Sequence, residues 1–296
     1  MYNVGICQLV QHDALDAATE GFQDALVDEL GEENVNFDLQ NAGGDSNTCA
    51  TITNQFVTDG VDLIMANATP ALQAAMASTA DIPIVATSVT DFATALDIDV
   101  DDWTGTTGIN VTGTADLAPL ADQAAMVKEL CPDASKVGIL YCSAEPNSKY
   151  QSNVITEELE GLGYEVAEYT VADTNQIADV TTKAVGEVDV IYIPTDNTIA
   201  SATAAVKEIV EPAKIPVIAG EEGICSGCGV ATLSISYYDI GYQAGQMAAQ
   251  ILTEGADPAE MEIAYATDLT KKYIKDRADA LGITIPDDYE AIEAAE

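Results

Sequence analysis

Basic residues are scarce in this sequence. Only 10 of the 296 residues are Lys or Arg, whereas 50 are Asp or Glu, and the formal net charge at pH 7 is −40. A surface with this charge repels phosphate backbones and anionic lipid headgroups, so we expect binding neither to nucleic acid nor directly to a membrane surface. We interpret the acidic excess as a feature that keeps the protein soluble.

Long apolar runs and several well-known motifs are also missing. No apolar run reaches the roughly 18 residues needed to cross a bilayer. The sequence contains no Gly-x-Gly-x-x-Gly after its first strand, no Gly-x-x-x-x-Gly-Lys-Ser/Thr loop and no Gly-x-Ser-x-Gly turn. Dinucleotide redox chemistry, nucleotide hydrolysis and serine hydrolysis therefore lose most of their support. The chain begins at a strand-type segment, which is typical of a cytoplasmic protein or of a chain whose export segment has been removed.

Histidine and paired cysteines are too few for a conventional metal site. His12 is the only histidine, and four of the six cysteines are scattered and read as small buried hydrophobic residues. Cys225 and Cys228 form the single Cys-x-x-Cys motif, whereas a four-ligand zinc site needs further ligands. We therefore expect a small loop disulfide or two free thiols there, with no metal and no cofactor.

Three apolar segments occur twice in the same order, about 130 residues apart. Each is bounded by loop residues, as expected for buried strands. The pairs are Val4–Ile6 with Val137–Ile139, Val61–Ile64 with Val188–Ile191, and Ile82–Ala86 with Ile215–Ala219. A chain of this length holds about two domains, so the duplication predicts one α/β unit used twice.

Strand-type and helix-type segments alternate within each half, which predicts parallel sheets covered by helices. In the first half we expect strands at 3–9, 34–39, 61–66 and 82–87 and helices at 14–30, 47–59 and 70–79. In the second half we expect helices at 116–130, 148–161, 175–186 and 198–210 and strands at 136–142, 164–170, 188–193 and 215–219.

The C-terminal part does not fit a plain tandem repeat. It predicts a strand ending near 235, a helix at 238–252, a strand-type segment at 263–267, a helix at 271–281 and a frayed acidic tail. We interpret these as returns between two lobes, through a hinge of three crossings near 110–114, 234–238 and 265–268. The predicted lobe 1 is 1–112 and 237–265, and lobe 2 is 113–236 and 266–296. Both lobes are predicted to be α/β, each a parallel sheet flanked by helices.

Polar residues follow the predicted strands, where open parallel α/β sheets collect their ligands. Thr69 and Pro70 fit the cap and first turn of a helix whose free N–H groups suit a carboxylate. The candidate ligand-binding residues are Gln8, His12, Asn67, Ala68, Thr69, Ser88, Thr90, Asp91, Ser143, Glu145, Asn147, Thr195, Asp196 and Asn197.

These loops resemble those of a known family. The blocks Ser143–Ser148 (Ser-Ala-Glu-Pro-Asn-Ser) and Pro194–Ala200 (Pro-Thr-Asp-Asn-Thr-Ile-Ala) are specific. Supporting matches are Gln8, His12–Asp16, Asn67–Pro70, Val89–Asp91, Asn110–Gly113, and Tyr237-Tyr238 before Gly241. Over about residues 3–280 the chain resembles substrate-binding proteins of bacterial ABC importers with the type I periplasmic-binding fold, in the group with tryptophan and tyrosine binders. It departs from that pattern at Asp13, at Ser236 and in the Cys225/Cys228 pair.

The resemblance implies a monomeric receptor that closes two lobes on a small ligand, an aromatic amino acid, and delivers it to a membrane permease without catalysis. The ligand carboxylate would bind near Ala68-Thr69 and Thr90, the ammonium at Asp196 or Glu145, and the apolar part beside His12. It also implies a signal peptide and a place on the extracellular or periplasmic face, lipid-anchored through a cysteine that precedes the given sequence.

Two alternatives stay open at this point. Cys7 and Cys142 lie at or just past the ends of the corresponding first strands of the two lobes, as in two-lobed amino-acid racemases that use paired cysteines as acid and base. That family's glycine-rich and Gly-Cys-Thr motifs are absent. The sensor domain of a transcription regulator would need a DNA-binding headpiece, which the sequence does not contain.

Overall fold

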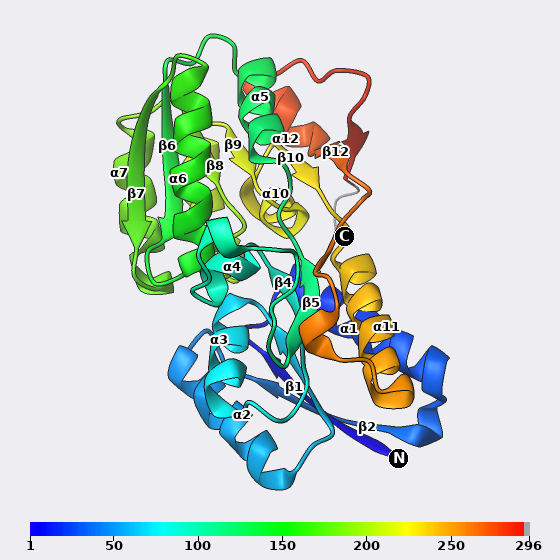
Figure 1. Ribbon diagram of the computed structural model, residues 1–296. Helices are drawn as coiled ribbons and strands as arrows, with labels where there is room; N and C mark the ends of the chain where they lie inside the picture. Colours follow the sequence, from blue (N-terminus) through cyan, green and yellow to red (C-terminus); the bar gives the residue numbers. More distant parts are fainter. Residues whose placement is uncertain (293–296) are drawn as a thin grey trace. The chain divides into compact units, whose positions relative to one another are not determined.

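A computed structural model describes residues 1–292 of the chain (Figure 1), and these fall into two compact units. Unit 1 is Met1–Leu117 with Ser236–Thr267, and unit 2 is Ala118–Ile235 with the chain from Asp268 onwards. The chain therefore changes unit three times. In the described part of the chain, no helix has the length and apolar character that crossing a membrane requires.

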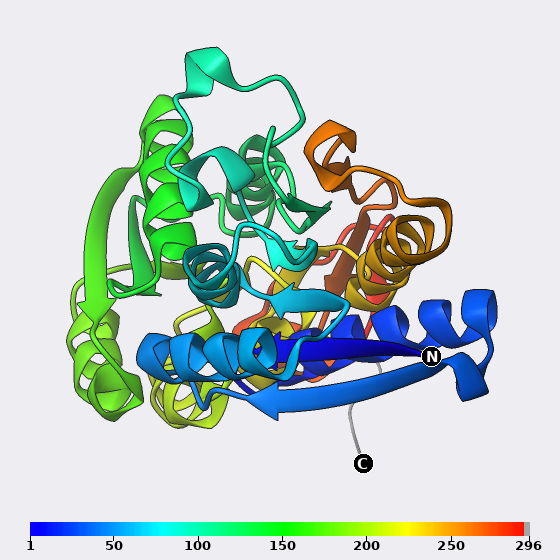
Figure 2. The ribbon, with the colours of Figure 1, turned by 60° about the horizontal axis from the view of Figure 1, so that its bottom comes forward.

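Unit 1 is built on a six-stranded, fully parallel sheet with the order β11-β5-β4-β3-β1-β2. Figure 2 shows β1 and β2 side by side. The strands are β1 (Tyr2–Gln8), β2 (Val35–Asn41), β3 (Leu63–Asn67), β4 (Ile84–Val89), β5 (Val111–Ala115) and β11 (Ala264–Tyr265). The helices are α1 (Asp13–Leu30), α2 (Ser46–Asp59), α3 (Thr69–Ser78), the short α4 (Phe92–Ala95) and α11 (Tyr237–Glu254), with 3-10 turns at Glu32–Asn34, Val100–Asp102 and Pro258–Glu260.

Alternate residues of the buried strands pack into two different apolar cores, because successive side chains of a strand point to opposite faces of the sheet. In β3, Leu63 and Met65 join the cluster with Phe22 of α1 and Ala244 of α11. The intervening Ile64 joins the cluster made with α2 and α3. Both faces of the sheet are therefore covered by helices, as the continuous apolar run predicts.

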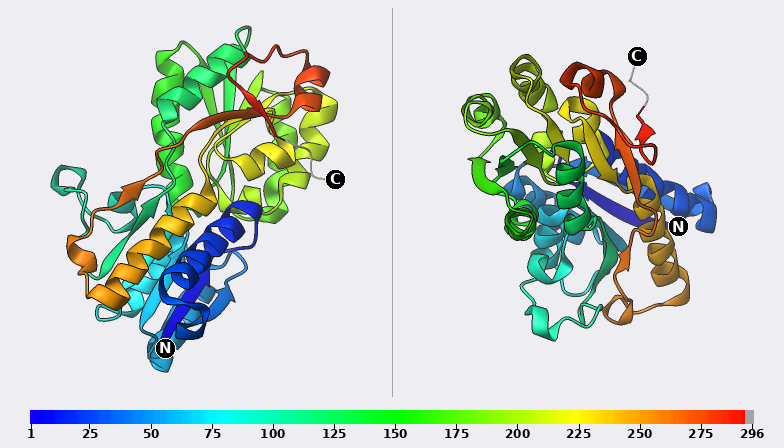
Figure 3. Two further views of the ribbon diagram at one scale, coloured as in Figure 1. Left: turned by 90° about the vertical axis from the view of Figure 1, so that its right-hand side faces the viewer. Right: turned by 90° about the horizontal axis from the view of Figure 1, so that it is seen from above.

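Helices α1 and α11 lie side by side (left view of Figure 3) and approach closely at glycines. A Cβ at Gly21 would lie 2.1 Å from the carbonyl oxygen of Tyr238, and a Cβ at Gly241 would lie 2.0 Å from that of Ala18. Neither glycine has a positive φ. Contact between the two backbones, rather than chain flexibility, thus explains these glycines.

Unit 2 has a seven-stranded sheet with the order β13-β12-β10-β9-β8-β6-β7, in which only the β10–β12 pair is antiparallel. Helices α7, α9 and α10 share one apolar core. The strands are β6 (Lys136–Cys142), β7 (Glu165–Val171), β8 (Val190–Ile193), β9 (Val217–Ala219), β10 (Ala231–Ser234), β12 (Thr270–Tyr273) and β13 (Glu290–Ala291). The helices are α5 (Leu120–Leu130), α6 (Pro146–Gly161), α7 (Ile177–Val185), α8 (Asn197–Ala200), α9 (Thr203–Ala213), α10 (Glu222–Cys228) and α12 (Lys275–Leu281), with a 3-10 turn at Thr174–Gln176.

The structure corrects the expected elements at three places. The predicted helix 271–281 is wrong in its first turn, because Thr270–Tyr273 pairs with β10 as a strand and the helix begins only at Lys275. The predicted helix 198–210 is broken into α8 and α9 around Ser201. The acidic tail forms β13 rather than fraying from its start, and the last four residues of that prediction, 293–296, lie outside the described residues.

Candidate functional site

In unit 1 the carboxyl ends of three neighbouring strands, β1, β3 and β4, carry the residues selected from the sequence. Parallel strands end at the same edge of a sheet, so their loops form one polar edge. Gln8 and Asn67 at this edge form a hydrogen-bond network with Asp16 and Thr19 of α1. Gln8 Nε2 donates to Asp16 Oδ1 at 2.6 Å, and Thr19 Oγ1 donates to Gln8 Oε1 at 2.7 Å. Asn67 Nδ2 donates to Thr19 Oγ1 at 2.9 Å, whereas its buried Oδ1 has no partner within the described chain.

Two helices, α1 and α3, begin at this edge without a side-chain hydrogen bond from the N-cap residue. The N-cap of α3 is Ala68 and not Thr69 as expected, because Thr69 is already the first residue of the helix. Ala68 is buried, has a φ of +89° and lends no side-chain hydrogen bond to the helix. Pro70 occupies the first turn of α3. His12, the half-buried N-cap of α1, likewise provides no side-chain cap. Free N–H groups and the helix dipole at such ends favour an anion.

The end of β4 is irregular and buried. The β4–β5 register shifts between Ala86 and Val89, and Ser88 between them has a φ of +56°. The hydroxyl of Ser88 is buried and has no hydrogen-bond partner among residues 1–292. A bulge of this kind re-aims a side chain and is common beside binding sites. Asp91 is already used, since its Oδ1 accepts the N–H of Thr94 at 2.7 Å and caps α4.

Asp116 was missed in the sequence. The expected helix at 116–130 placed it inside a helix, but it directly follows β5 and is only 4% exposed. Its Oδ1 accepts from Thr90 Oγ1 at 3.1 Å, and its Oδ2 accepts from Tyr237 Oη at 2.8 Å. Burial raises the pKa of Asp116, while these two hydrogen bonds lower it by a smaller amount. The strand-type segment Val111–Ala115 followed at once by a carboxylate was the signal that could have found it.

In unit 2 the polar groups of the matching loops form hydrogen bonds with one another. Buried Glu145 accepts five of them, which exhausts the acceptor capacity of a carboxylate. The donors are Asn147 Nδ2 (3.1 Å), Asn197 N (3.2 Å), Asn197 Nδ2 (2.8 Å), Thr198 N (2.8 Å) and Thr198 Oγ1 (2.7 Å). Glu145 therefore organises the start of α8 from the neighbouring loop.

Asp196 is also engaged internally. Its Oδ2 accepts from Cys142 N at 2.6 Å and Ser148 Oγ at 2.7 Å, and its Oδ1 accepts from Ile199 N at 2.9 Å, capping α8. Burial first, and then the nearby charge of Glu145, raise the pKa of Asp196 to about 7. These contacts favour a loop-organising role for Asp196 over direct binding of a ligand charge.

The remaining candidates in unit 2 form a smaller network. Thr195 donates its N–H to Gln151 Oε1 at 3.1 Å and accepts from Gln151 Nε2 at 3.1 Å. Asn147 Nδ2 also reaches Thr195 O at 3.3 Å, whereas its buried Oδ1 has no partner in the described chain. Ser143 Oγ donates to Val171 O at 3.2 Å. Gln151, one helical turn into α6, was not selected from the sequence.

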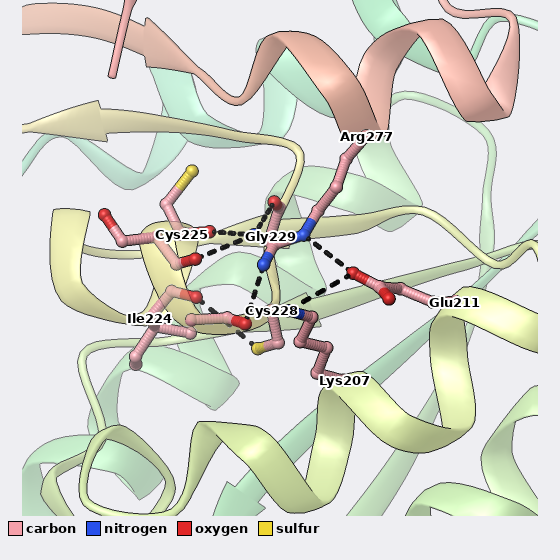
Figure 4. Close-up of polar contacts among 9 residues, drawn as sticks. Lys207, Glu211, Ile224, Cys225, Cys228, Gly229 and Arg277 are labelled. Carbon is pink, nitrogen blue, oxygen red and sulfur yellow. Dashed lines mark hydrogen bonds and ion pairs between the residues drawn. The ribbon is translucent and has the colours of Figure 1, made fainter. Parts of the chain in front are cut away.

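The cysteines show no pairing. Cys225 and Cys228 are free and buried in α10, a helix rather than a loop, and Figure 4 shows the backbone carbonyl of Cys225 facing Arg277. Burial raises the pKa of Cys228 to about 12. Cys7 and Cys142 are also buried, and their pKa values are raised, chiefly by the Cys49 hydrogen bond for Cys7 and by burial for Cys142. Within residues 1–292, no group of acidic, histidine and cysteine side chains is suited to hold a metal.

Comparisons with known proteins identify the family of the chain. The family model described as ABC transporter substrate binding protein matches residues 3–295. A tyrosine-binding protein of Clostridioides difficile (strain R20291) is 38% identical over 263 residues, which cover 88% of this chain and 75% of that protein. The crystal structure of an ABC domain from Streptococcus pneumoniae in complex with L-Trp is 34% identical, with a TM-score of 0.91 over 97% of this chain and 96% of that one. A conserved domain protein from Vibrio cholerae is 31% identical, with a TM-score of 0.93 over 98% and 99%.

The fold and the strand-end loops define a solute-binding protein. The chain belongs to the ABC transporter substrate-binding protein family. This confirms the family and the α/β fold class expected from the sequence, and it places the protein on the extracytoplasmic side of a membrane, working with a permease. The comparisons give no support to the racemase alternative.

The raised pKa of Asp196 predicts a pH dependence of stability. The unfolded group titrates near 3.9, and the folded one titrates at about 7. The folded chain therefore holds this proton more tightly, so the free energy of unfolding should fall as pH rises from about 4 to about 7, by at most ~1.4 kcal/mol per pH unit. Asp196→Asn should flatten the slope measured by urea unfolding of the ligand-free protein between pH 5 and 8. A slope unchanged from wild type would contradict the assignment.

Proposed function

We propose that this protein binds an aromatic L-amino acid and passes it unchanged to the permease of an ABC importer. The observation that carries the proposal is the polar edge of unit 1, where an uncapped helix end suited to an anion lies two strands from a buried carboxylate. A zwitterion supplies both complementary charges. The two named relatives, which bind tyrosine or were solved with L-Trp, support the aromatic side chain.

The site that we propose retains the residues selected from the sequence. The hydrogen bonds of each residue decide which role we assign to it. The ligand carboxylate is assigned to the N-terminus of α3 and to Ser88, whose buried hydroxyl has no partner within residues 1–292. Glu145 and Asp196 are assigned to the organisation of the loops in unit 2. The proposal includes a monomeric protein, anchored to the membrane through a lipid.

A ligand screen tests the proposed function. L-Tyrosine, L-tryptophan and L-phenylalanine should raise the melting temperature, because a ligand at a hundredfold excess over Kd stabilises the folded state by about 2.7 kcal/mol. Nucleosides, small sugars and L-leucine serve as controls. Calorimetry should give one ligand per chain, and the ligand recovered after incubation should keep its chirality. If only controls stabilise the protein, or if the recovered amino acid is racemised, the proposal is wrong.

A further inference from the structure

Asp116 is a buried carboxylate that has no cationic partner within residues 1–292. It is 4% exposed, and its two hydrogen-bond donors, Thr90 and Tyr237, are both neutral hydroxyls. All ten Lys and Arg residues of the chain lie at position 128 or later and outside 236–267, so unit 1 contains neither. A buried charge is costly unless it is paired. The structure thus holds a buried carboxyl group for which unit 1 offers no lysine or arginine.

Four buried carboxylates follow strand ends, namely Asp116, Glu145, Asp196 and Glu221, and they differ in the hydrogen bonds that they already receive. Glu221 is the N-cap of α10, and its side chain accepts the N–H groups of Gly223 and Ile224. A carboxylate offers about four acceptor directions. Glu145 receives five hydrogen bonds and Asp196 receives three, of which two come from backbone N–H groups. Within residues 1–292, Asp116 receives two hydrogen bonds from other residues, both from side-chain hydroxyls, so acceptor directions remain on its carboxylate. Among the described residues of unit 1, Asp116 is the one buried carboxylate, and it can still accept hydrogen bonds from an ammonium group.

The position of Asp116 fits the dimensions of an amino acid. Asp116 follows β5, which pairs with β4, and β4 pairs with β3, which leads into the uncapped α3. Adjacent strands are about 4.8 Å apart, so the two strand ends are separated by about 10 Å. An α-amino acid spans roughly 3 Å from its nitrogen to a carboxylate oxygen, and a hydrogen bond of about 2.8 Å at each end brings the total to about 9 Å.

We infer that Asp116 is the residue that binds the ligand ammonium, and that the ends of β3, β4 and β5 in unit 1 together recognise the α-ammonium-carboxylate group. This inference rests on the proposed function and makes it more specific. Selection for a free α-amino acid is then a property of unit 1. Thr90 and Tyr237 act as positioning residues that hold the carboxylate in place.

The test compares two ligands that differ only in the ammonium group, L-tryptophan and indole-3-propionate, by calorimetry on the full chain. Wild type should bind L-tryptophan at least a hundredfold more tightly than indole-3-propionate. Asp116→Asn should weaken the affinity for L-tryptophan at least tenfold and change the affinity for indole-3-propionate by no more than about threefold. The reason is that the asparagine side chain has the same shape as aspartate but carries no charge. Asp81→Asn is the matched control, since this exposed residue precedes the amino end of β4, and it should change neither affinity.

Several outcomes would overturn the inference. If Asp116→Asn weakened the affinity for both ligands equally, Asp116 would have a structural role only. If Asp116→Asn still preferred L-tryptophan over indole-3-propionate, and Glu145→Gln or Asp196→Asn lost that preference, the ammonium would be assigned to unit 2. The proposed function would then stand. Failure of wild type to bind any aromatic amino acid would overturn both. If Asp116→Asn does not fold, Asp116→Ser, which keeps a hydroxyl beside Thr90 and Tyr237, is judged by the same comparison.

Discussion

Arg277→Ala is expected to lower the free energy of unfolding by about 3–5 kcal/mol. The Arg277 side chain is only 14% exposed, and its guanidinium donates to the carbonyl oxygens at the end of α10 and to Glu211 of α9 (Figure 4). The carbonyl acceptors are Cys225 (2.8 Å), Ser226 (2.9 Å), Gly227 (2.8 Å) and Gly229 (2.9 Å), and Glu211 Oε1 lies 3.1 Å from Nε. Alanine leaves all of these acceptors without the cation, and the last carbonyls of a helix have no partners within the helix.

Lys275→Ala provides the control for this effect, because Lys275 lies in the same helix. Its ion pair with Asp279 is short, at 2.6 Å, but the two side chains are 67% and 66% exposed. Exposed pairs of this kind contribute little, so we expect a change within about 0.5 kcal/mol. Arg277→Lys should recover only part of the loss, since an ammonium cannot reproduce the planar fork of donors. Urea unfolding measures all three variants. If Arg277→Ala cost no more than Lys275→Ala, the role of Arg277 in holding α10 would be wrong.

Gly241→Ala is expected to destabilise the protein by about 3 kcal/mol, at the upper end of the usual cost of overpacking. The added Cβ would lie 2.0 Å from the carbonyl oxygen of Ala18 and 2.7 Å from its Cα. These are backbone atoms of α1, so no side chain can rotate away, and α1 and α11 must move apart. That movement would disturb the core formed by Phe22 and Ala244. The midpoint of thermal or urea unfolding measures the loss.

Gly161→Ala is the matched control for the glycine prediction. Gly161 is the last residue of α6, its φ is not positive, and a Cβ there would meet nothing within 4 Å. Alanine should therefore stabilise the protein, by up to about 1 kcal/mol, because glycine loses more backbone freedom on folding. If both alanine variants changed stability in the same direction and by the same amount, close helix contact could not be the reason for Gly241.

Much of the site edge could be predicted from the sequence, but the roles of its carboxylates could not. Helix and strand periodicity located the loops that contain Ala68, Glu145 and Asp196, because loop position depends on local pattern. Their hydrogen-bond partners depend on chain segments that are distant in sequence. Asp196 accepts from Cys142, 54 residues away, and Asp116 accepts from Tyr237, 121 residues away. No local pattern contains those donors, which is why the sequence points to Asp196 or Glu145 for the ammonium and not to Asp116.

The sequence alone determined the duplicated α/β pattern, the polar strand ends and the resemblance to a family, since these follow from residue order and spacing. Tertiary structure decided whether each element kept its expected form. Residues 271–273 continue a helix-type segment, yet they pair with β10, because sheet hydrogen bonds and side-chain packing outweigh a weak local preference. It also decided which buried charges are satisfied. Burial and hydrogen bonding depend on neighbours that come together only on folding, so the structure reveals a fully engaged Glu145 and an Asp116 with acceptor capacity to spare.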